Sequence, residues 1–242
     1  MHREGFAAAG LEGWTYDLLD VAPAALAGAV ESLRSAEVAG ANVTIPHKIA
    51  VMALLDRVEP EAVQVGAVNT IRREGSRLIG SNTDVQGIFS ALGLVGVEPG
   101  GADVVVLGGG GSARAVATAL SGARLTFVAR TPEAALGLRG KIIPWGSENW
   151  QPLIRHADLV INTTPLGRRD EMPFRPGLLP PRGAIIDLVY VTGGTPLVRR
   201  ARALGLRCAD GWEVLLAQGA ASFQAWTGCV APLTAMRRAL PE

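Results

Sequence analysis

The chain has 242 residues, of which 48% are hydrophobic, and a formal net charge of +1. A composition so rich in apolar residues excludes a disordered chain and is typical of a well-packed α/β protein. The nearly balanced charge, with basic residues scattered along the chain, gives no electrostatic reason to expect a nucleic acid or an anionic membrane as a partner.

The first third of the chain alternates strand-like and helix-like segments. Two segments have proline near the start and apolar residues at helical spacing, which predicts helices at 23–34 and 46–55. A further helix is expected at 86–94. Runs bounded by turn residues predict strands at 14–21, 40–45, 68–72 and 77–80, the last two joined at Gly75.

The second half of the chain repeats the order strand, helix, strand. Near-continuous apolar runs, typical of buried parallel strands, predict strands at 103–107, 124–128, 159–163 and 184–189. A helix is expected at 114–120, and the stretch 211–240 reads as helical with a break near Gly228 and Pro232. This alternation predicts an α/β fold with a doubly wound parallel sheet.

Targeting and metal-binding signals are missing from the sequence. The longest apolar runs have the length of strands, and the N-terminus lacks the basic-then-apolar layout of a signal peptide. Cys208 and Cys229 are far apart, without a histidine at metal-ligand spacing. We therefore expect a cytoplasmic protein with two reduced thiols, no disulfide framework and no bound metal.

A glycine-rich loop follows the strand at 103–107. Gly108, Gly110 and Ala113 fit the pattern G-x-G-x-x-(G/A), and Gly111 and Ser112 complete the loop. The pattern permits a tight turn, close approach of the backbone to a pyrophosphate, and close packing of the next helix. A flexible structural turn is the alternative. Because the loop joins a strand to a helix and a second strand follows, we expect a dinucleotide site.

The end of the second strand of this unit indicates which dinucleotide binds. An NAD enzyme usually carries Asp or Glu there, for the ribose 2′-hydroxyl. This chain has Arg130 followed by Thr131 and no acidic residue. A guanidinium and a hydroxyl can bind a 2′-phosphate, which predicts NADP; a solvated surface arginine is the alternative.

Lys48 is the candidate acid–base residue. It follows the strand at 40–45 and is expected in the first turn of a helix, where the helix dipole favours release of its proton. Only Lys48 and Lys141 are lysines, and arginine elsewhere cannot release a proton in a protein. A surface lysine is the alternative.

Further polar side chains follow the neighbouring strands. Asp84 ends the segment Ser81-Asn-Thr-Asp84. The alternative to a functional role is that Asp84 is simply a helix N-cap. Thr44 and Asn69 also lie near strand ends. With Lys48 they would supply donors and acceptors at one sheet edge, where α/β proteins bind ligands.

These motifs together resemble the shikimate dehydrogenase family. In chain order they are Asn42-Val-Thr-Ile-Pro-His-Lys48, Gly66-Ala-Val-Asn-Thr70, Gly80-Ser-Asn-Thr-Asp84, Asn162-Thr-Thr-Pro-Leu-Gly167, and Gln218-Gly-Ala with Trp226-Thr-Gly228. The resemblance extends through nearly the whole chain.

The resemblance implies reversible, NADP-linked reduction of 3-dehydroshikimate to shikimate. Lys48 would match the catalytic lysine and Asp84 its partner carboxylate. The matching substrate residues would be Thr44, Asn69, Gln218 and Tyr190. Beside the glycine loop and Arg130-Thr131, the cofactor would contact Thr163, Thr164, Leu166, Leu188 and Gly211.

The resemblance also implies a two-lobed α/β architecture. Residues 1–87, completed by the C-terminal helices at 212–242, would form the substrate and catalytic domain. Residues 88–211 would form a Rossmann-type NADP domain. We expect small-molecule partners only, without nucleic acid or membrane, in a monomer or a homodimer.

The sequence departs from the family pattern in two places. Family members usually begin with a strand and a loop of the type G-x-P-x-x-H-S-x-S-P, whose serines hold the substrate carboxylate, whereas this chain begins at Met1-His2-Arg3. Either the true start lies upstream, or the chain is a truncation that binds NADP but turns over poorly. Ala129 also replaces the asparagine common before the Arg-Thr pair.

Three alternative functions remain open from the sequence. A quinate or dual quinate/shikimate dehydrogenase would share the lysine–aspartate pair, but its NAD-using type would have an acid where Arg130 stands. A methylene-tetrahydrofolate dehydrogenase shares the two-lobed layout but not the motifs. A non-catalytic NADP-binding paralogue would agree with the absent serines and disagree with the intact Lys48 and Asp84.

Overall fold

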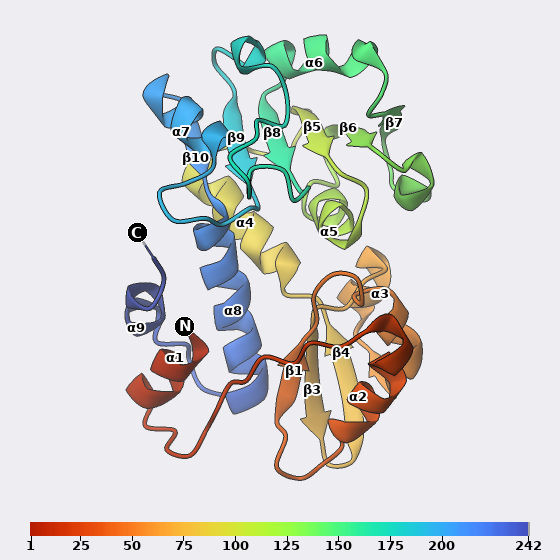
Figure 1. Cartoon of the computed structure of the whole chain (residues 1–242), viewed down its shortest axis with the longest axis vertical. Coiled ribbons are helices and arrows are strands. Elements are labelled where there is room, and N and C mark those ends of the chain that lie inside the picture. The colour runs from red at the N-terminus through yellow and green to blue at the C-terminus, as the bar shows by residue number, and fades with distance from the viewer. Residues whose placement is uncertain (242) are drawn as a thin grey trace. The chain divides into compact units, whose positions relative to one another are not determined.

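The structure, a computed structural model, describes residues 1–241. The chain divides into two units, one comprising Met1–Gln86 with Leu216–Pro241 and the other Gly87–Leu215 (Figure 1). The helices α4 (Asp84–Val95) and α8 (Gly211–Thr227) carry the chain between the units. The C-terminal helices therefore return to the first unit.

The first unit is built on a four-stranded sheet. Its strands are β1 (Gly40–Asn42), β3 (Thr70–Glu74), β4 (Arg77–Ser81) and β2 (Arg57–Val58), in the order β1-β3-β4-β2. β3 pairs antiparallel with both β1 and β4, and β2 runs parallel to β4. The expected turn between β3 and β4 is confirmed, with Gly75 at φ +61°.

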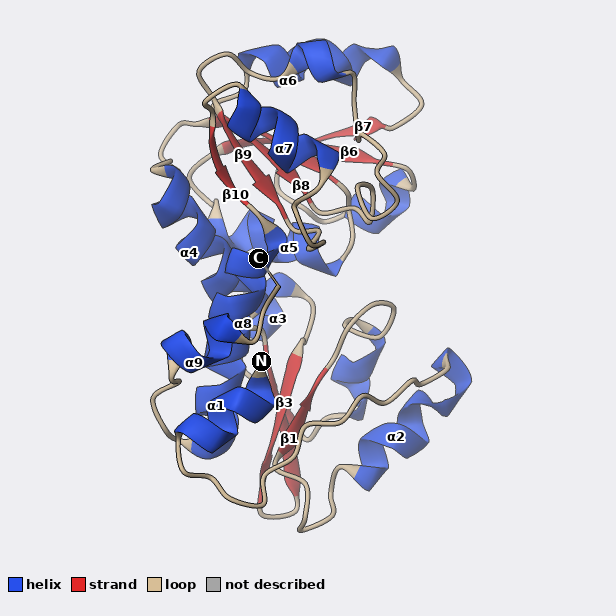
Figure 2. Ribbon diagram, turned by 60° about the vertical axis from the view of Figure 1, so that its left-hand side comes forward, coloured by secondary structure: helices blue, strands red, loops and turns tan. Residues whose placement is uncertain are grey.

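Helices cover both faces of this sheet (Figure 2). One face packs against α2 (Leu26–Ser32), the 3-10 helix η2 (Ala50–Leu54) and α3 (Pro60–Val65), through a buried cluster that includes Val30, Val51, Ile71 and Leu78. A short 3-10 helix η1 (Pro23–Ala25) leads into α2. Near the other face α1 (His2–Ala8), α9 (Leu233–Arg238) and the second half of α8 share a cluster of Phe6, Leu216, Phe223 and Met236.

The second unit is built on a six-stranded parallel sheet in the order β10-β9-β8-β5-β6-β7. The strands are β5 (Asp103–Leu107), β6 (Arg124–Ala129), β7 (Lys141–Pro144), β8 (Leu159–Asn162), β9 (Ala184–Asp187) and β10 (Arg207–Ala209). The chain winds outward from β5 in one direction and then restarts beside β5 with β8. The topological switch point, where such sheets bind ligands, thus lies between β5 and β8.

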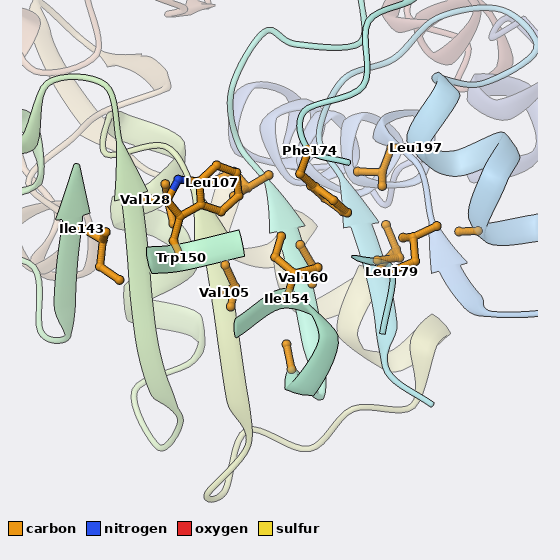
Figure 3. Packing of buried hydrophobic residues seen from close by; sticks show 13 residues of the cluster. Val105, Leu107, Val128, Ile143, Trp150, Ile154, Val160, Phe174, Leu179 and Leu197 are labelled. Carbon is orange, nitrogen blue, oxygen red and sulfur yellow. The ribbon is translucent and has the colours of Figure 1, made fainter. Parts of the chain in front are cut away.

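Helices on both sides complete the doubly wound layers, so the predicted fold class is confirmed. α6 (Gln151–His156) and α7 (Pro196–Ala203) cover one face, and α5 (Gly111–Ala119) lies on the other (Figures 1 and 2). Figure 3 shows the core on the first of these faces, where Trp150 and Ile154 pack over Val105 and Val160. The short 3-10 helices are η3 (Pro132–Ala135), η4 (Glu148–Trp150) and η5 (Pro176–Leu178).

The strand predicted at 14–21 is wrong. Within the described part of the chain this segment pairs with no strand, and Leu18 and Leu19 are 92% and 70% exposed. Side chains hold its first residues instead. The Trp14 ring lies 5.3 Å from that of Phe6, and the Tyr16 hydroxyl donates to Asn42 Oδ1 at 3.0 Å.

The helix predicted at 46–55 is largely wrong as well. Residues 45–49 form turns, and only the 3-10 helix η2 follows. The carbonyl of Lys48 accepts a hydrogen bond from the Val68 amide at 2.8 Å. This bond joins the turn to a segment twenty residues further along the chain. Lys48 therefore lies in a turn, and the argument from a helix dipole does not apply to it.

Candidate active site

Lys48 and Asp84 form an ion pair in the first unit. Lys48 Nζ donates to Asp84 Oδ2 at 2.6 Å, and the two side chains are only 12% and 15% exposed. Asp84 begins α4, where Asn82 Oδ1 accepts from the Asp84 amide at 3.0 Å, while the Asp84 carboxylate oxygens accept from the side chains of Lys48 and Asn69. The carboxylate is thus free to hold and orient a lysine that remains accessible.

Asn69 connects this pair to the rest of the unit. Its Nδ2 donates to Asp84 Oδ1 at 2.8 Å and lies 3.4 Å from Gln218 Oε1, while its Oδ1 accepts from the Thr83 amide at 2.7 Å. The structure therefore brings together four of the predicted residues, Lys48, Asn69, Asp84 and Gln218. Thr44, the fifth predicted residue of this unit, lies exposed four residues before Lys48 in the same turn-rich segment.

A buried hydroxyl cluster lies behind Asn69 and was missed by the sequence reasoning. Ser222, fully buried on α8, lies 2.8 Å from Thr70 Oγ1 and 3.1 Å from Thr83 Oγ1, and accepts from Asn42 Nδ2 at 3.0 Å. Thr83 is the immediate neighbour of Asp84. The only signal in the sequence was a polar residue within the apolar stretch of α8.

The glycine loop of the second unit has the geometry of a dinucleotide site. Gly108 has φ +120°, and a Cβ there would lie 2.2 Å from Thr163 Oγ1. A Cβ on Gly110 would meet nothing within 4 Å, and the N-terminus of α5 that follows has no side-chain cap. Ala113 is fully buried. The loop therefore offers uncapped amides and open space to a pyrophosphate, and the residues present fit the cofactor.

Arg130 and Thr131 lie at the end of β6, where the cofactor's ribose is expected. Arg130 is exposed, and in the described part of the chain neither side chain has a hydrogen-bond partner. The sequence reasoning missed Arg114 of α5, whose Nη2 donates to Ala134 O at 3.2 Å and so ties the helix to the loop after β6. Both predicted side chains are free to bind a phosphate.

The loops after β8 and β9 contain the remaining predicted cofactor residues. The Thr163 hydroxyl donates to Leu107 O at 2.7 Å, across the switch point. The Thr164 hydroxyl donates to Asn162 Oδ1 at 2.7 Å and accepts from the Leu166 amide at 3.2 Å. These bonds fix the backbone of the loop beside the glycine loop.

Three predicted residues meet where the chain leaves β9. A Cβ on Gly211 would lie 2.7 Å from Leu188 O, so only glycine allows this approach of α8 to the loop. Tyr190 is 43% exposed, and its ring lies 4.9 Å from that of Trp212. Gly211, which is buried, thus packs against the segment that carries Leu188 and Tyr190.

The part of the chain that the structure describes contains no group of three His, Cys, Asp or Glu side chains that could hold a metal ion. No helix described there is both long and apolar enough to cross a bilayer. Cys208 and Cys229 are free thiols.

The fold and the site define the class: a two-unit α/β protein with a Rossmann-type dinucleotide-binding sheet and a lysine–aspartate pair. Family models for the shikimate dehydrogenase substrate binding domain and the shikimate 5'-dehydrogenase C-terminal domain match residues 1–71 and 211–240. The chain is 42% identical to the NADP(+) shikimate dehydrogenase of Moorella thermoacetica, over all of this chain and 87% of that protein. Identity to the enzyme of Rubrobacter xylanophilus is 43%, over 99% of this chain and 89% of that one.

Solved structures agree with these matches. The Thermus thermophilus shikimate 5-dehydrogenase in complex with NADP(H) and shikimate superimposes with a TM-score of 0.85 at 36% identity, covering 98% of this chain and 90% of that one. The Aquifex aeolicus shikimate dehydrogenase gives a TM-score of 0.88 at 33% identity, with the same coverage of both chains. The chain belongs to the shikimate dehydrogenase family.

Proposed function

We propose that this protein catalyses the reversible NADP-dependent reduction of 3-dehydroshikimate to shikimate. The observation that carries the proposal is the ion pair of Lys48 and Asp84, with 2.6 Å between Nζ and Oδ2, in a chain of this family. A lysine held this way can give a proton to a substrate oxygen and take it back. The product would place the protein in chorismate and aromatic amino acid biosynthesis.

Proton transfer is the task of Lys48. In the direction of reduction its Nζ gives a proton to the carbonyl oxygen, and the resulting neutral amine regains one from water. In the reverse direction the neutral amine takes the proton of the shikimate hydroxyl. When bound, NADPH supplies the hydride that the carbonyl carbon receives.

Asp84 and the amides around it hold the reacting oxygen and the lysine in place. The carboxylate orients Lys48 through Oδ2 and binds Asn69 through Oδ1. Because each carboxylate oxygen has more than one lone pair, it can also accept from the substrate hydroxyl. Thr44, Asn69 and Gln218 would bind substrate hydroxyls and the carboxylate. Asn69 and Gln218 lie within 3.4 Å of each other, so one ring acid can contact both.

The second unit would bind NADP at the switch point of its sheet. The amides of Gly110, Gly111 and Ser112 would meet the pyrophosphate, beside Gly108 and Ala113. Arg130 and Thr131 would bind the 2′-phosphate. The nicotinamide half would contact the two loops after β8 and β9, at Thr163, Thr164, Leu166, Leu188 and Gly211, with Tyr190 near both substrate and nicotinamide.

The test is shikimate-dependent reduction of NADP, followed at the nicotinamide absorbance band, with Lys48→Ala as the blank. We expect turnover with shikimate and NADP, and much weaker turnover when quinate replaces shikimate or NAD replaces NADP. Equal turnover with quinate would identify a dual-specificity dehydrogenase. Saturable NADP binding without turnover of either acid would reject the enzyme in favour of a cofactor-binding protein.

Size-exclusion chromatography distinguishes the proposed monomer from a homodimer, and fractionation of cells tests the cytoplasmic location.

A further inference from the structure

Asp187 is a buried acid of the second unit to which the proposed mechanism assigns no role. It is the last residue of β9, and its side chain is fully buried. Its neighbour in the sheet is Asn162, the last residue of β8, in register with it. Both residues end their strands at the edge of the sheet from which the proposed cofactor loops emerge.

Three donors from three segments converge on the Asp187 carboxylate. Oδ1 accepts from Asn162 Nδ2 at 2.9 Å and from the Val189 amide at 3.0 Å. Oδ2 accepts from the Thr195 hydroxyl at 2.6 Å. An ionised carboxylate accepts hydrogen bonds only, so these three donors suit the charged form.

Each donor lies in, or next to, a loop that would contact NADP. Asn162 Nδ2 also donates to Leu166 O at 2.9 Å, and its Oδ1 accepts from the Thr164 hydroxyl, so it sets the loop after β8. Val189 lies between Leu188 and Tyr190. The carboxylate thus joins the two loops that would hold the nicotinamide half.

Thr195 lies at the end of the loop after β9, which contains Tyr190, and directly before α7. Its Oγ1 accepts from the Val198 amide at 3.2 Å and so caps α7. Gly167, at the end of the loop after β8, has φ +108°, and a Cβ there would lie 3.0 Å from Thr195 Cγ2. The two loops therefore pack against each other where Asp187 holds them.

The charge of Asp187 is sensitive to pH near neutrality. Burial raises the pKa of Asp187 to about 6, against the opposing effect of the hydrogen bonds from Thr195, Val189 and Asn162. The negative charge of Asp210 raises it further; Asp210 is itself paired with Arg202 of α7 at 2.8 Å. A protonated Asp187 would need an acceptor, and of its three partners only the Thr195 hydroxyl can turn to provide one.

We propose that the ionised carboxylate of Asp187 is a positioning group for NADP, which fixes the loops after β8 and β9 in the conformation that binds the nicotinamide half. The inference rests on the proposed function, since it concerns the same cofactor site. Asp187 itself touches neither substrate nor cofactor in this account; it acts through Asn162, Val189 and Thr195.

The experiment measures the dissociation constant of NADP by isothermal titration calorimetry for the wild type and Asp187→Asn, from pH 5 to pH 8. Asn has the size of Asp and resembles its protonated form. The 2′-phosphate of the cofactor also titrates near pH 6 and affects both proteins alike. The quantity compared is therefore the dissociation constant of the variant divided by that of the wild type at the same pH. We expect the variant to bind about tenfold more weakly at pH 8, as loss of a charge-assisted hydrogen bond implies. The ratio should fall toward one as the pH approaches 5, below the pKa of Asp187 of about 6.

The matched control is Asp158→Asn, which makes the same change at the opposite end of β8. Asp158 accepts from the Asp103 amide at 2.8 Å and is exposed. Its ratio to the wild type should stay near one at every pH. A ratio for Asp187→Asn that is one throughout, or raised but independent of pH, would overturn the inference; the second result would mean a merely structural role.

A second pair of variants covers the case in which Asp187→Asn does not fold. Thr195→Val removes the donor to Oδ2 and should weaken NADP binding at pH 8 more than at pH 5, whereas Thr195→Ser should not. Tight binding by Thr195→Val at pH 8 would overturn the inference. A wild type that binds no NADP at any pH would instead remove the proposed function, so the two failures are distinguishable.

Discussion

Asp84 stands at the first position of a helix, where an acidic side chain usually serves as a cap. In this protein Asn82 bonds the Asp84 amide, and the Asp84 carboxylate bonds Lys48 and Asn69 instead. The residue types and their order along the chain were enough to select these side chains as candidates. The contacts among them depend on the pairing of β3 with β4 and on the approach of α8, which no local pattern contains.

Arg130 should determine the choice between the two dinucleotides. Arg130→Leu removes the guanidinium proposed to bind the 2′-phosphate, and loss of such charged hydrogen bonds should raise the KM for NADP by about ten- to a hundredfold. The KM for NAD, which lacks that phosphate, should change little. Steady-state kinetics with both cofactors measure the two values.

The control for this prediction is Arg182→Leu. Arg182 is also exposed but precedes β9, at the opposite edge of the same sheet. The Arg182→Leu variant should leave the KM values for NADP and for NAD unchanged. Equal losses for NADP and NAD in Arg130→Leu would show that Arg130 does not read the 2′-phosphate.

The sequence predicted the residues of the candidate site better than the residues that support them. The pair of Lys48 and Asp84 and the free Arg130 were selected by residue type, spacing and resemblance. Arg114, Asp187 and Ser222 were missed because each acts through a hydrogen bond to a segment distant in the sequence. For Asp187 the visible signal was an acid at the end of the buried run Ala184–Asp187, since an acid fully buried there needs donors from neighbouring loops.

At the scale of single elements, the two wrong predictions have one cause. The segment 14–21 has the composition of a strand and the segment 46–55 the period of a helix, yet each is fixed by contacts with other parts of its unit. Tyr16 bonds Asn42, and the Lys48 carbonyl bonds the Val68 amide. Local propensity is a weak prior that tertiary contacts override.

Ser222 attaches α8 to the sheet of the first unit. Ser222→Ala should lower the free energy of unfolding by about 1–3 kcal/mol, because Thr70, Thr83 and Asn42 each lose a buried partner. Ser32→Ala, on the exposed face of α2, should change it by less than about 0.5 kcal/mol. Urea unfolding measures both. Equal stability of the two variants would contradict the attachment.

His2 makes the attachment of α1 sensitive to acid. Its ring stacks on Tyr16 at 4.5 Å, and burial together with the positive N-terminus lowers the pKa of His2 from 6.5 to about 4. The unfolded chain therefore binds a proton more readily than the folded one between these values, so this stability is present above pH 6.5 and is lost as the pH falls toward 4. The full loss amounts to about 3 kcal/mol.

The variant His2→Phe keeps an aromatic ring and removes this titration. The difference in unfolding free energy between His2→Phe and the wild type should therefore grow as the pH falls from 6.5 to 4. The comparison with the wild type matters because Asp187, whose pKa is raised to about 6, shifts stability in the opposite direction over the same range. A difference that is constant with pH would show that His2 is not buried in its neutral form.

At the scale of the whole molecule, the parallel sheet was the most predictable part of the fold. Its strands are continuous apolar runs such as Val104–Leu107, buried on both faces, and the glycine loop marks the switch point. The first unit was less predictable. Its order β1-β3-β4-β2 includes the two-residue strand β2, which is too short to leave a periodic pattern.

The central claim is that Lys48 moves a proton, and the pair of variants Lys48→Arg and Lys48→Met tests it most directly. Lys48→Arg retains a positive charge beside Asp84 but cannot release a proton. We predict that kcat for shikimate oxidation falls by about a hundredfold to ten-thousandfold in both variants, while NADP still binds with its usual Kd. A Lys48→Arg variant with nearly the wild-type kcat would contradict the account, because only the charge of Lys48, and not its proton, would then be needed.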